Sequence, residues 1–131
     1  MTAKTVSRIA IALCAAAVLA VLAQAPGVKR TFLQRIDVPD SNRETVMGVA
    51  EIPAGGVAGR HTHPGVELSY ILEGTASLEI EGETPRLVKA GESFTIPNGK
   101  VHDAKVVGEV PLKVLAIYVV EKGKPLASPA P

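Results

Sequence analysis

Short runs of apolar residues, many of them β-branched, alternate with turn-forming residues along most of this chain. Eight such runs cover residues 32–38, 45–52, 67–72, 76–80, 86–88, 93–96, 101–107 and 113–120. Gly, Pro, Asn and Asp separate them, as expected of turns. The stretch SLEIE at 77–81 alternates polar and apolar residues, which is typical of a strand with one buried face. The pattern predicts an all-β domain, built as a sandwich or barrel.

The N-terminal segment follows a different pattern. Lys4 and Arg8 precede an unbroken apolar run over residues 9–23. A basic start followed by a short apolar run indicates an export signal, and this run is shorter than the roughly 20 residues that span a bilayer. We expect residues 1–25 to be a signal peptide cleaved near 23–25, and the protein to be periplasmic or secreted. An N-terminally membrane-anchored form is the alternative.

Removal of the signal peptide changes the net charge and the cysteine content of the mature chain. The whole chain of 131 residues has a formal net charge of +1; without Lys4 and Arg8, 12 basic residues remain against 13 acids, a net charge of −1. This near-neutral balance argues against nucleic acid or a membrane surface as a partner of the mature form. The single cysteine, Cys14, lies within the signal. A mature domain without thiols depends on its core, or on a bound metal, for stability.

The C-terminal end is rich in Pro, Ala and Ser. Residues 122–131 read KGKPLASPAP, and such a terminal composition predicts a flexible tail. The folded domain is therefore expected over residues 26–121.

Candidate chemistry lies in the stretch GRHTHPGVE at 59–67. His61 and His63 are two residues apart and Glu67 has the same parity, so on a strand their side chains leave one face. The mature chain has one other histidine, His102. Imidazole and carboxylate ligands suit a divalent transition metal, namely Fe, Mn, Ni, Zn, Co or Cu. Two histidines at this spacing are a weak signal alone, and exposed strand residues or a hydrogen-bonded polar network are the alternatives.

The spacing of glycines around these residues resembles the two conserved boxes of the cupin superfamily. The first box, G(x)5HxH(x)3,4E(x)6G, is matched from Gly55 to Gly74. The second, G(x)5PxG(x)2H(x)3N, is matched from Gly91 through Gly99 and His102, but Val106 stands where the pattern has Asn. The resemblance covers about residues 48–120 and suits a small single-domain member.

The resemblance implies a double-stranded β-helix, a jelly-roll barrel of six to eight strands with a metal inside one end. By position, His61, His63, Glu67 and His102 correspond to the metal ligands, and Val106 falls at a position that is not a ligand. We expect Gly74 and Gly99 to lie in tight turns or at close backbone approaches. The pocket wall is expected from residues of suitable parity: Ser69, Ile71 and Phe94.

The expected function is that of an exported metal-binding cupin that acts on a small organic molecule. A metal-dependent dioxygenase is the favoured enzymatic version, because four protein ligands leave coordination positions for other molecules. A metal-dependent isomerase or decarboxylase, and a non-catalytic small-ligand or metal-binding protein, are the alternatives. With two Phe, two Tyr and no Trp, the pocket is expected to be small and mostly apolar. Assembly into a homodimer is expected, chiefly by resemblance.

Overall fold

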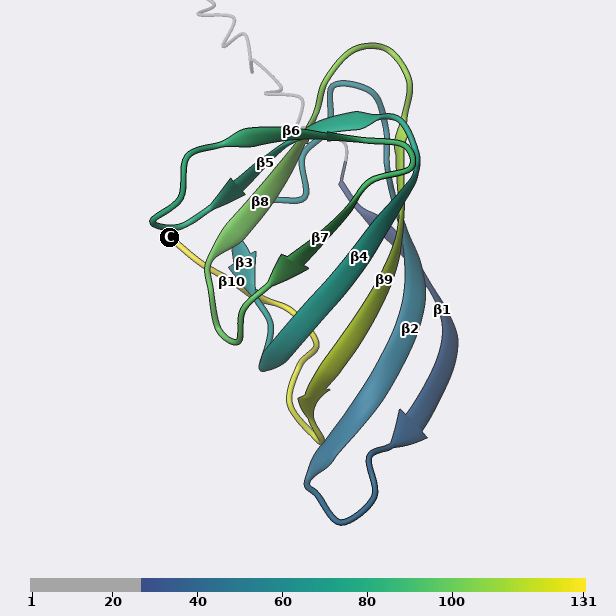
Figure 1. Ribbon diagram of the computed structural model, residues 1–131, viewed down its shortest axis with the longest axis vertical. Coiled ribbons are helices and arrows are strands. Elements are labelled where there is room, and N and C mark those ends of the chain that lie inside the picture. Colours follow the sequence, from purple (N-terminus) through teal and green to yellow (C-terminus); the bar gives the residue numbers. More distant parts are fainter. Residues whose placement is uncertain (1–26) are drawn as a thin grey trace, which may run out of the picture.

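The computed structural model describes residues 27–131, so the expected signal peptide lies outside the described residues. Every regular element in this part is a strand (Figure 1). The strands are β1 (Lys29–Asp37), β2 (Arg43–Ile52), β3 (His61–Thr62), β4 (Gly65–Glu73), β5 (Thr75–Ile80), β6 (Arg86–Lys89), β7 (Ser93–Ile96), β8 (His102–Val106), β9 (Leu112–Glu121) and β10 (Ser128–Pro129). Within residues 27–131, no helix has the length and hydropathy needed to cross a membrane.

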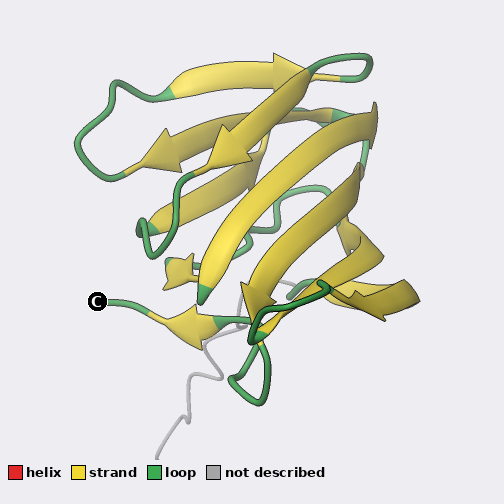
Figure 2. Cartoon of the chain, turned by 60° about the horizontal axis from the view of Figure 1, so that its bottom comes forward, coloured by secondary structure: helices red, strands yellow, loops and turns green. Residues whose placement is uncertain are grey.

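The strands form two five-stranded antiparallel sheets that face each other (Figure 2). One sheet has the order β1-β2-β9-β4-β7, and the other has the order β10-β3-β8-β5-β6. The pairs β1–β2 and β5–β6 are neighbours within one sheet, and all other successive strands cross from one sheet to the other. This arrangement confirms the all-β prediction.

Period-two alternation explains how the strands build the core. In β9, alternate residues from Leu112 to Val120 are buried and those between them are only partly covered. β5 repeats the pattern, with Ala76, Leu78 and Ile80 inside. The main core contains these residues together with Ile71 and others, and a smaller cluster is formed by Val46, Ala116, Tyr118 and Val120.

Glycines take the conformations expected of the turns. Gly55, Gly74, Gly91 and Gly99 have positive φ angles of 73°, 84°, 91° and 71°, values that a residue with a Cβ adopts only at a steric cost. At Gly74, a Cβ would also lie 2.5 Å from the carbonyl oxygen of Pro111. Glycine is therefore required at position 74 for two reasons, the positive φ of the turn and the close approach of the Pro111 backbone.

All eight expected strands are present, with ends shifted by a few residues. The structure adds two short strands, β3 and β10, and they pair with each other through Thr62 and Ser128. The structure thus differs from the expectation of a flexible tail at 122–131. This segment returns along β3, where the Ala130 amide donates to the Arg60 carbonyl at 3.0 Å. Its apolar Leu126 packs against the smaller core cluster, which is why the segment lies against the domain.

Candidate metal centre

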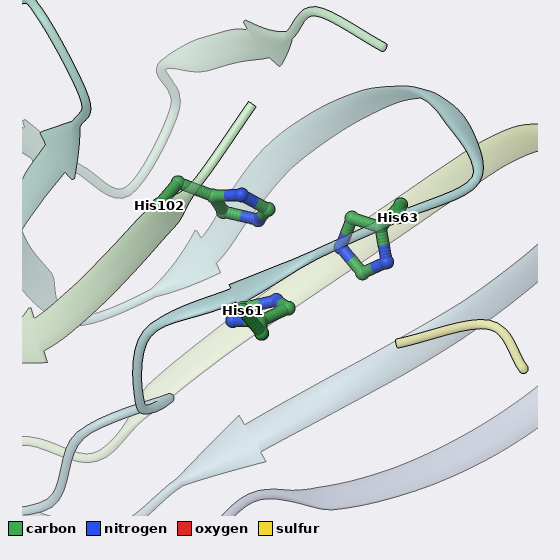
Figure 3. A group of neighbouring side chains, drawn as sticks. All are labelled: His61, His63 and His102. Atoms are coloured by element: carbon green, nitrogen blue, oxygen red, sulfur yellow. The ribbon is translucent and has the colours of Figure 1, made fainter. Parts of the chain in front are cut away.

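The three histidines of the described chain meet between the two sheets (Figure 3). His61 lies on β3 and His63 just after it, while His102 begins β8 and is the register partner of His61. One potential ligand atom from each residue lies within 4.8 Å of the other two. His63 and His102 are buried and His61 is half-buried. The structure therefore brings together residues that lie up to 41 positions apart.

Each histidine ring is held by a backbone carbonyl at its Nδ1 atom. His61 Nδ1 lies 2.6 Å from the Gly59 oxygen, His102 Nδ1 lies 2.9 Å from the Lys100 oxygen, and His63 Nδ1 lies 2.6 Å from the Leu126 oxygen. A carbonyl only accepts hydrogen bonds, so in each ring the proton is assigned to Nδ1. The Nε2 atoms are then left with free lone pairs, as in metal-binding histidines oriented by outer partners.

Glu67 reaches the same point from the opposite sheet. It lies on β4, where its neighbour in register on β9 is Tyr118. Its Oε2 atom is 2.9 Å from His63 Nε2 and 3.4 Å from His102 Nε2. Its other oxygen, Oε1, accepts a hydrogen bond of 2.5 Å from the Ser69 hydroxyl. Glu67 therefore presents one oxygen to the histidines while Ser69 holds the other.

The arrangement around His63 fits a cation. His63 Nε2 is fully buried and has no hydrogen-bond partner, although a carboxylate oxygen lies 2.9 Å away. With the ring proton on Nδ1, this contact sets a lone pair against a carboxylate, which costs free energy unless positive charge lies between them. Nitrogen and oxygen ligands about 2.0–2.2 Å from one ion are roughly 3.0–3.5 Å apart at angles of 90–110°. The two measured separations fall close to this range.

Electrostatics keeps the site in the protonation state that metal binding needs. Burial lowers the pKa of His61 to about 4, although its hydrogen bond to Gly59 opposes this shift. Burial would raise the pKa of Glu67, but the His102, His63 and Ser69 side chains beside its carboxylate outweigh burial and hold the pKa well below its usual range. A neutral imidazole and an ionised carboxylate are the ligand forms that a metal ion requires.

A buried phenol lies beside the centre. The Tyr118 ring is 4.7 Å from the His63 ring, centroid to centroid. Burial, together with the negative charge of Glu67, raises the pKa of the Tyr118 hydroxyl, and the nearby Arg30 guanidinium partly opposes this. Tyr118 is therefore a protonated group at the edge of the site. Tyr118 could not be predicted as a site residue, because no motif includes it and it stands within the apolar run 113–120.

Of the three residues expected in the pocket wall, one lies at the site and two lie in the core. Ser69 is buried and touches Glu67, as described above. Ile71 is completely buried and Phe94 is 8% exposed, and both belong to the main core. The cavity beside His61 is lined instead by residues before β3, on β1 and in the C-terminal segment. Ile71 and Phe94 are therefore core residues and do not line the cavity beside His61.

Two polar residues near the metal ligands, Asp103 and Arg60, bond to backbone groups of neighbouring segments. Asp103 follows His102 on β8, so strand alternation places it on the opposite face of the strand, yet it is only 5% exposed. Its carboxylate accepts a 2.9 Å hydrogen bond from the Gly59 amide, next to the carbonyl that holds His61. Arg60 precedes His61, and its Nε donates to the Pro131 carbonyl at 2.6 Å. Asp103 thus fixes the loop that positions His61.

Known proteins share this fold and parts of this sequence. A germin-like protein, subfamily 2 member 1, from Arabidopsis thaliana is 36% identical over 69 residues, which cover 49% of this chain and 32% of the relative. The DMSP lyase DddQ from Ruegeria pomeroyi superposes with a TM-score of 0.61 at 26% identity, over 69% of this chain and 44% of the lyase. This chain therefore spans less than half the length of either protein.

A smaller protein matches over more of its length. A cupin-like protein from Thermotoga maritima superposes with a TM-score of 0.62 at 21% identity, over 79% of this chain and 75% of the other. This likeness concerns the fold alone. The family model described as Cupin domain matches residues 48–118, which include all three histidines and Glu67. The chain belongs to the cupin family.

Proposed function

We propose that this protein is a metal-dependent enzyme that acts on a small organic molecule. The observation that carries the proposal is the common orientation of the site. Three backbone carbonyls occupy the Nδ1 atoms of His61, His63 and His102, and the Glu67 carboxylate lies against two of the opposite nitrogens. This arrangement presents three imidazole nitrogens and one carboxylate oxygen as ligands.

The chemical nature of the ligand atoms limits the metal to a divalent transition ion. Nitrogen and oxygen ligands without thiolate suit Fe, Mn, Ni, Zn, Co or Cu as a divalent ion. Such an ion would supply Lewis acidity, and a redox-active one would add electron transfer. The surrounding residues contribute orientation: the carbonyls hold the rings, and Ser69 holds the carboxylate. Held ligands favour the metal because little freedom remains to be lost on binding.

Dioxygenase chemistry is the first version of this proposal. Its support is the donor set of three imidazole nitrogens and one carboxylate oxygen, which can hold Fe(II).

A redox-neutral reaction, such as that of a lyase, isomerase or decarboxylase, is the second version. Tyr118 supports it, because a buried phenol with a raised pKa stays protonated near neutral pH and can donate a proton or hydrogen bond to a substrate. The likeness to the DMSP lyase DddQ, at 26% identity, adds to this support.

Metal content tests the proposal directly. We expect protein isolated from its native source to carry about one divalent ion per chain by elemental analysis. His102→Ala should lower that content at least tenfold, since it removes one of the ligands. Thr62→Ala is the matched control, because Thr62 lies between the two histidines in sequence and should leave the content unchanged. Full metal content in His102→Ala would show that the proposed ligand set is wrong.

The native metal also separates the two versions. Oxygen uptake with small phenolic and diketone compounds, measured at an oxygen electrode, is expected only for a redox-active metal. A redox-inert native metal together with no oxygen uptake would exclude the dioxygenase version. Tyr118→Phe should then reduce turnover in the redox-neutral version by about a hundredfold, the usual contribution of a positioned acid or base.

We also propose that the protein is exported, to the periplasm or outside the cell. The support is the sequence pattern of residues 1–25, with Lys4 and Arg8 before an apolar run. N-terminal sequencing of the native protein should show a new terminus near residues 24–26. An intact Met1 on protein in the membrane fraction would favour the anchored alternative.

A further inference from the structure

A cavity of about 280 Å³ opens beside His61. It is formed by the start of β1, the loop before β3 and the C-terminal segment, and its lining residues are Arg30, Ala58, Gly59, Arg60, His61, Ala127 and Pro129. A larger hollow of about 380 Å³ lies at the far ends of β4 and β8, between loops and away from the histidines. The smaller cavity is the one that adjoins the candidate metal centre.

The lining of this cavity carries two arginines and no carboxylate. Arg60 is already engaged: its Nε donates to the Pro131 carbonyl at 2.6 Å, and its Nη2 lies 3.9 Å from Glu81. Arg30 is exposed, and it takes part in none of the ion pairs found among residues 27–131. Arg30 is therefore the cation available to a bound molecule.

Arg30 also lies close to the reactive part of the site. It lines the same cavity as His61, one of the candidate metal ligands. Arg30 also lines a narrow crevice together with Tyr118. A molecule in the cavity would thus lie within reach of both Arg30 and His61.

We propose that this cavity binds a small carboxylate, with the Arg30 guanidinium donating hydrogen bonds to the carboxylate oxygens. The planar guanidinium fork matches the two oxygens of a carboxylate. A water molecule takes up about 30 Å³ in the liquid. A cavity of about 280 Å³ therefore suits an acid of only a few carbon atoms. This inference deepens the proposed function, on which it rests, by naming the substrate class.

The test is a titration of the Zn(II)-loaded protein followed by amide NMR. Propionate should shift the amide signals of Gly59 and Ala127, which line the cavity, whereas the neutral analogue propionamide should not. Arg30→Gln should weaken propionate binding about tenfold or more, since a charge-assisted hydrogen bond is lost. Arg86→Gln, a change at an exposed arginine on β6, is the matched control and should leave the binding unchanged.

Several outcomes would overturn the inference. These are an absence of shifts at Gly59 and Ala127, equal binding of propionate and propionamide, equal losses in the two arginine variants, and tighter binding of inorganic phosphate than of propionate. Imidazole, a neutral metal ligand, should bind the wild-type protein and Arg30→Gln equally.

Failure of the proposed function would look different. Zn(II) would then not bind at one ion per chain, whereas the propionate titration of metal-free protein would still report on the Arg30 cavity. Stoichiometric Zn(II) without selective carboxylate binding would refute the carboxylate inference alone.

Discussion

At the scale of single residues, backbone carbonyls matter as much as the ligands they orient. The oxygens of Gly59, Lys100 and Leu126 each accept from one histidine Nδ1. Without these contacts the rings could flip or change tautomer, and the Nε2 atoms would not share one point. The Nε2 atom of His63 is buried and has no hydrogen-bond partner. It is therefore free to bind a cation.

The acid sensitivity of the metal-free protein should depend on His61. Burial lowers its pKa in the folded state to about 4, below its ordinary value of 6.5. The unfolded chain therefore takes up a proton that the folded chain rejects between these values, so stability is lost as the pH falls from about 6.5 to 4. Urea midpoints in the presence of EDTA should decrease over this range. His61→Asn should flatten the dependence, and an equal slope in both proteins would contradict the assignment.

At the scale of the elements, β4 and β9 come unusually close at Gly65. A Cβ at this position would lie 2.0 Å from the Val119 carbonyl oxygen and 2.7 Å from the Val120 Cα atom. Both contacts are with backbone, which cannot move aside without breaking the pairing of the two strands. The same strand carries Glu67 two residues later, so this close approach also fixes a candidate ligand.

Gly65→Ala should therefore be severely destabilising. We expect a loss of about 3 kcal/mol or more in the free energy of unfolding, as for other overpacked sites, measured by urea denaturation. Gly27→Ala is the control, because a Cβ at Gly27 meets nothing within 4 Å. Similar stability of the two variants would show that the strands can separate at this point without cost.

The C-terminal segment is the second element with a direct effect on the site. It lies outside the residues that match the family model, 48–118, yet Leu126 supplies the carbonyl that holds His63 and β10 pairs with the strand that carries His61. The centre therefore depends on a part of the chain that neither motif includes.

Deletion of residues 124–131 should weaken metal binding about tenfold or more, the usual effect of losing an outer partner of a histidine ligand. Zn(II) affinity measured by competition with a chelator tests this, with far-UV circular dichroism to confirm that the strands remain. Leu126→Ala separates packing from hydrogen bonding, because it keeps the carbonyl and should keep most of the affinity. Unchanged affinity in the deleted protein would show that the Leu126 carbonyl does not matter.

At the scale of the whole molecule, one sheet has an apolar outer face. Val66, Leu68, Tyr70 and Leu72 on β4 are 38–47% exposed, and their register places Val66 to Tyr70 beside the partly covered Val119, Ile117 and Leu115 of β9. Isolated apolar residues are common on surfaces, but a continuous patch indicates an interface.

We propose that a second copy of the chain covers this face. The borders of the patch carry both signs of charge, Lys113 with Glu51 and Glu73 at one end and Lys124 with Glu121 at the other. Two such faces related by a two-fold axis can meet without bringing only like charges together.

Leu68→Asp should convert the dimer to a monomer. A charge in the centre of an apolar interface should raise the dissociation constant about a hundredfold or more, which light scattering after size exclusion would detect. Leu87→Asp is the control, since Leu87 is 65% exposed but lies on β6 in the other sheet. A wild-type protein that is already monomeric at micromolar concentration would refute the proposed interface.

The sequence by itself determined the strands, the turns and the donor types. Alternation along β5 is a local property, since successive side chains on a strand point to opposite faces, and it predicted one buried face there. The spacing of Gly55, His61, His63 and Glu67, with His102 beyond them, predicted which side chains would gather. Positive φ at Gly74 and Gly99 follows from steric rules that act within a few residues.

Only the tertiary structure decided what surrounds those donors. A backbone carbonyl has no sequence signature, so the contact of Leu126 with His63 could not be predicted, and composition alone indicated a flexible tail. Tyr118 looked like an ordinary core residue, and Arg30 lay outside every motif. Their positions beside the site depend on strand pairing and on contacts between segments far apart in sequence, which are settled only when the two sheets pack together.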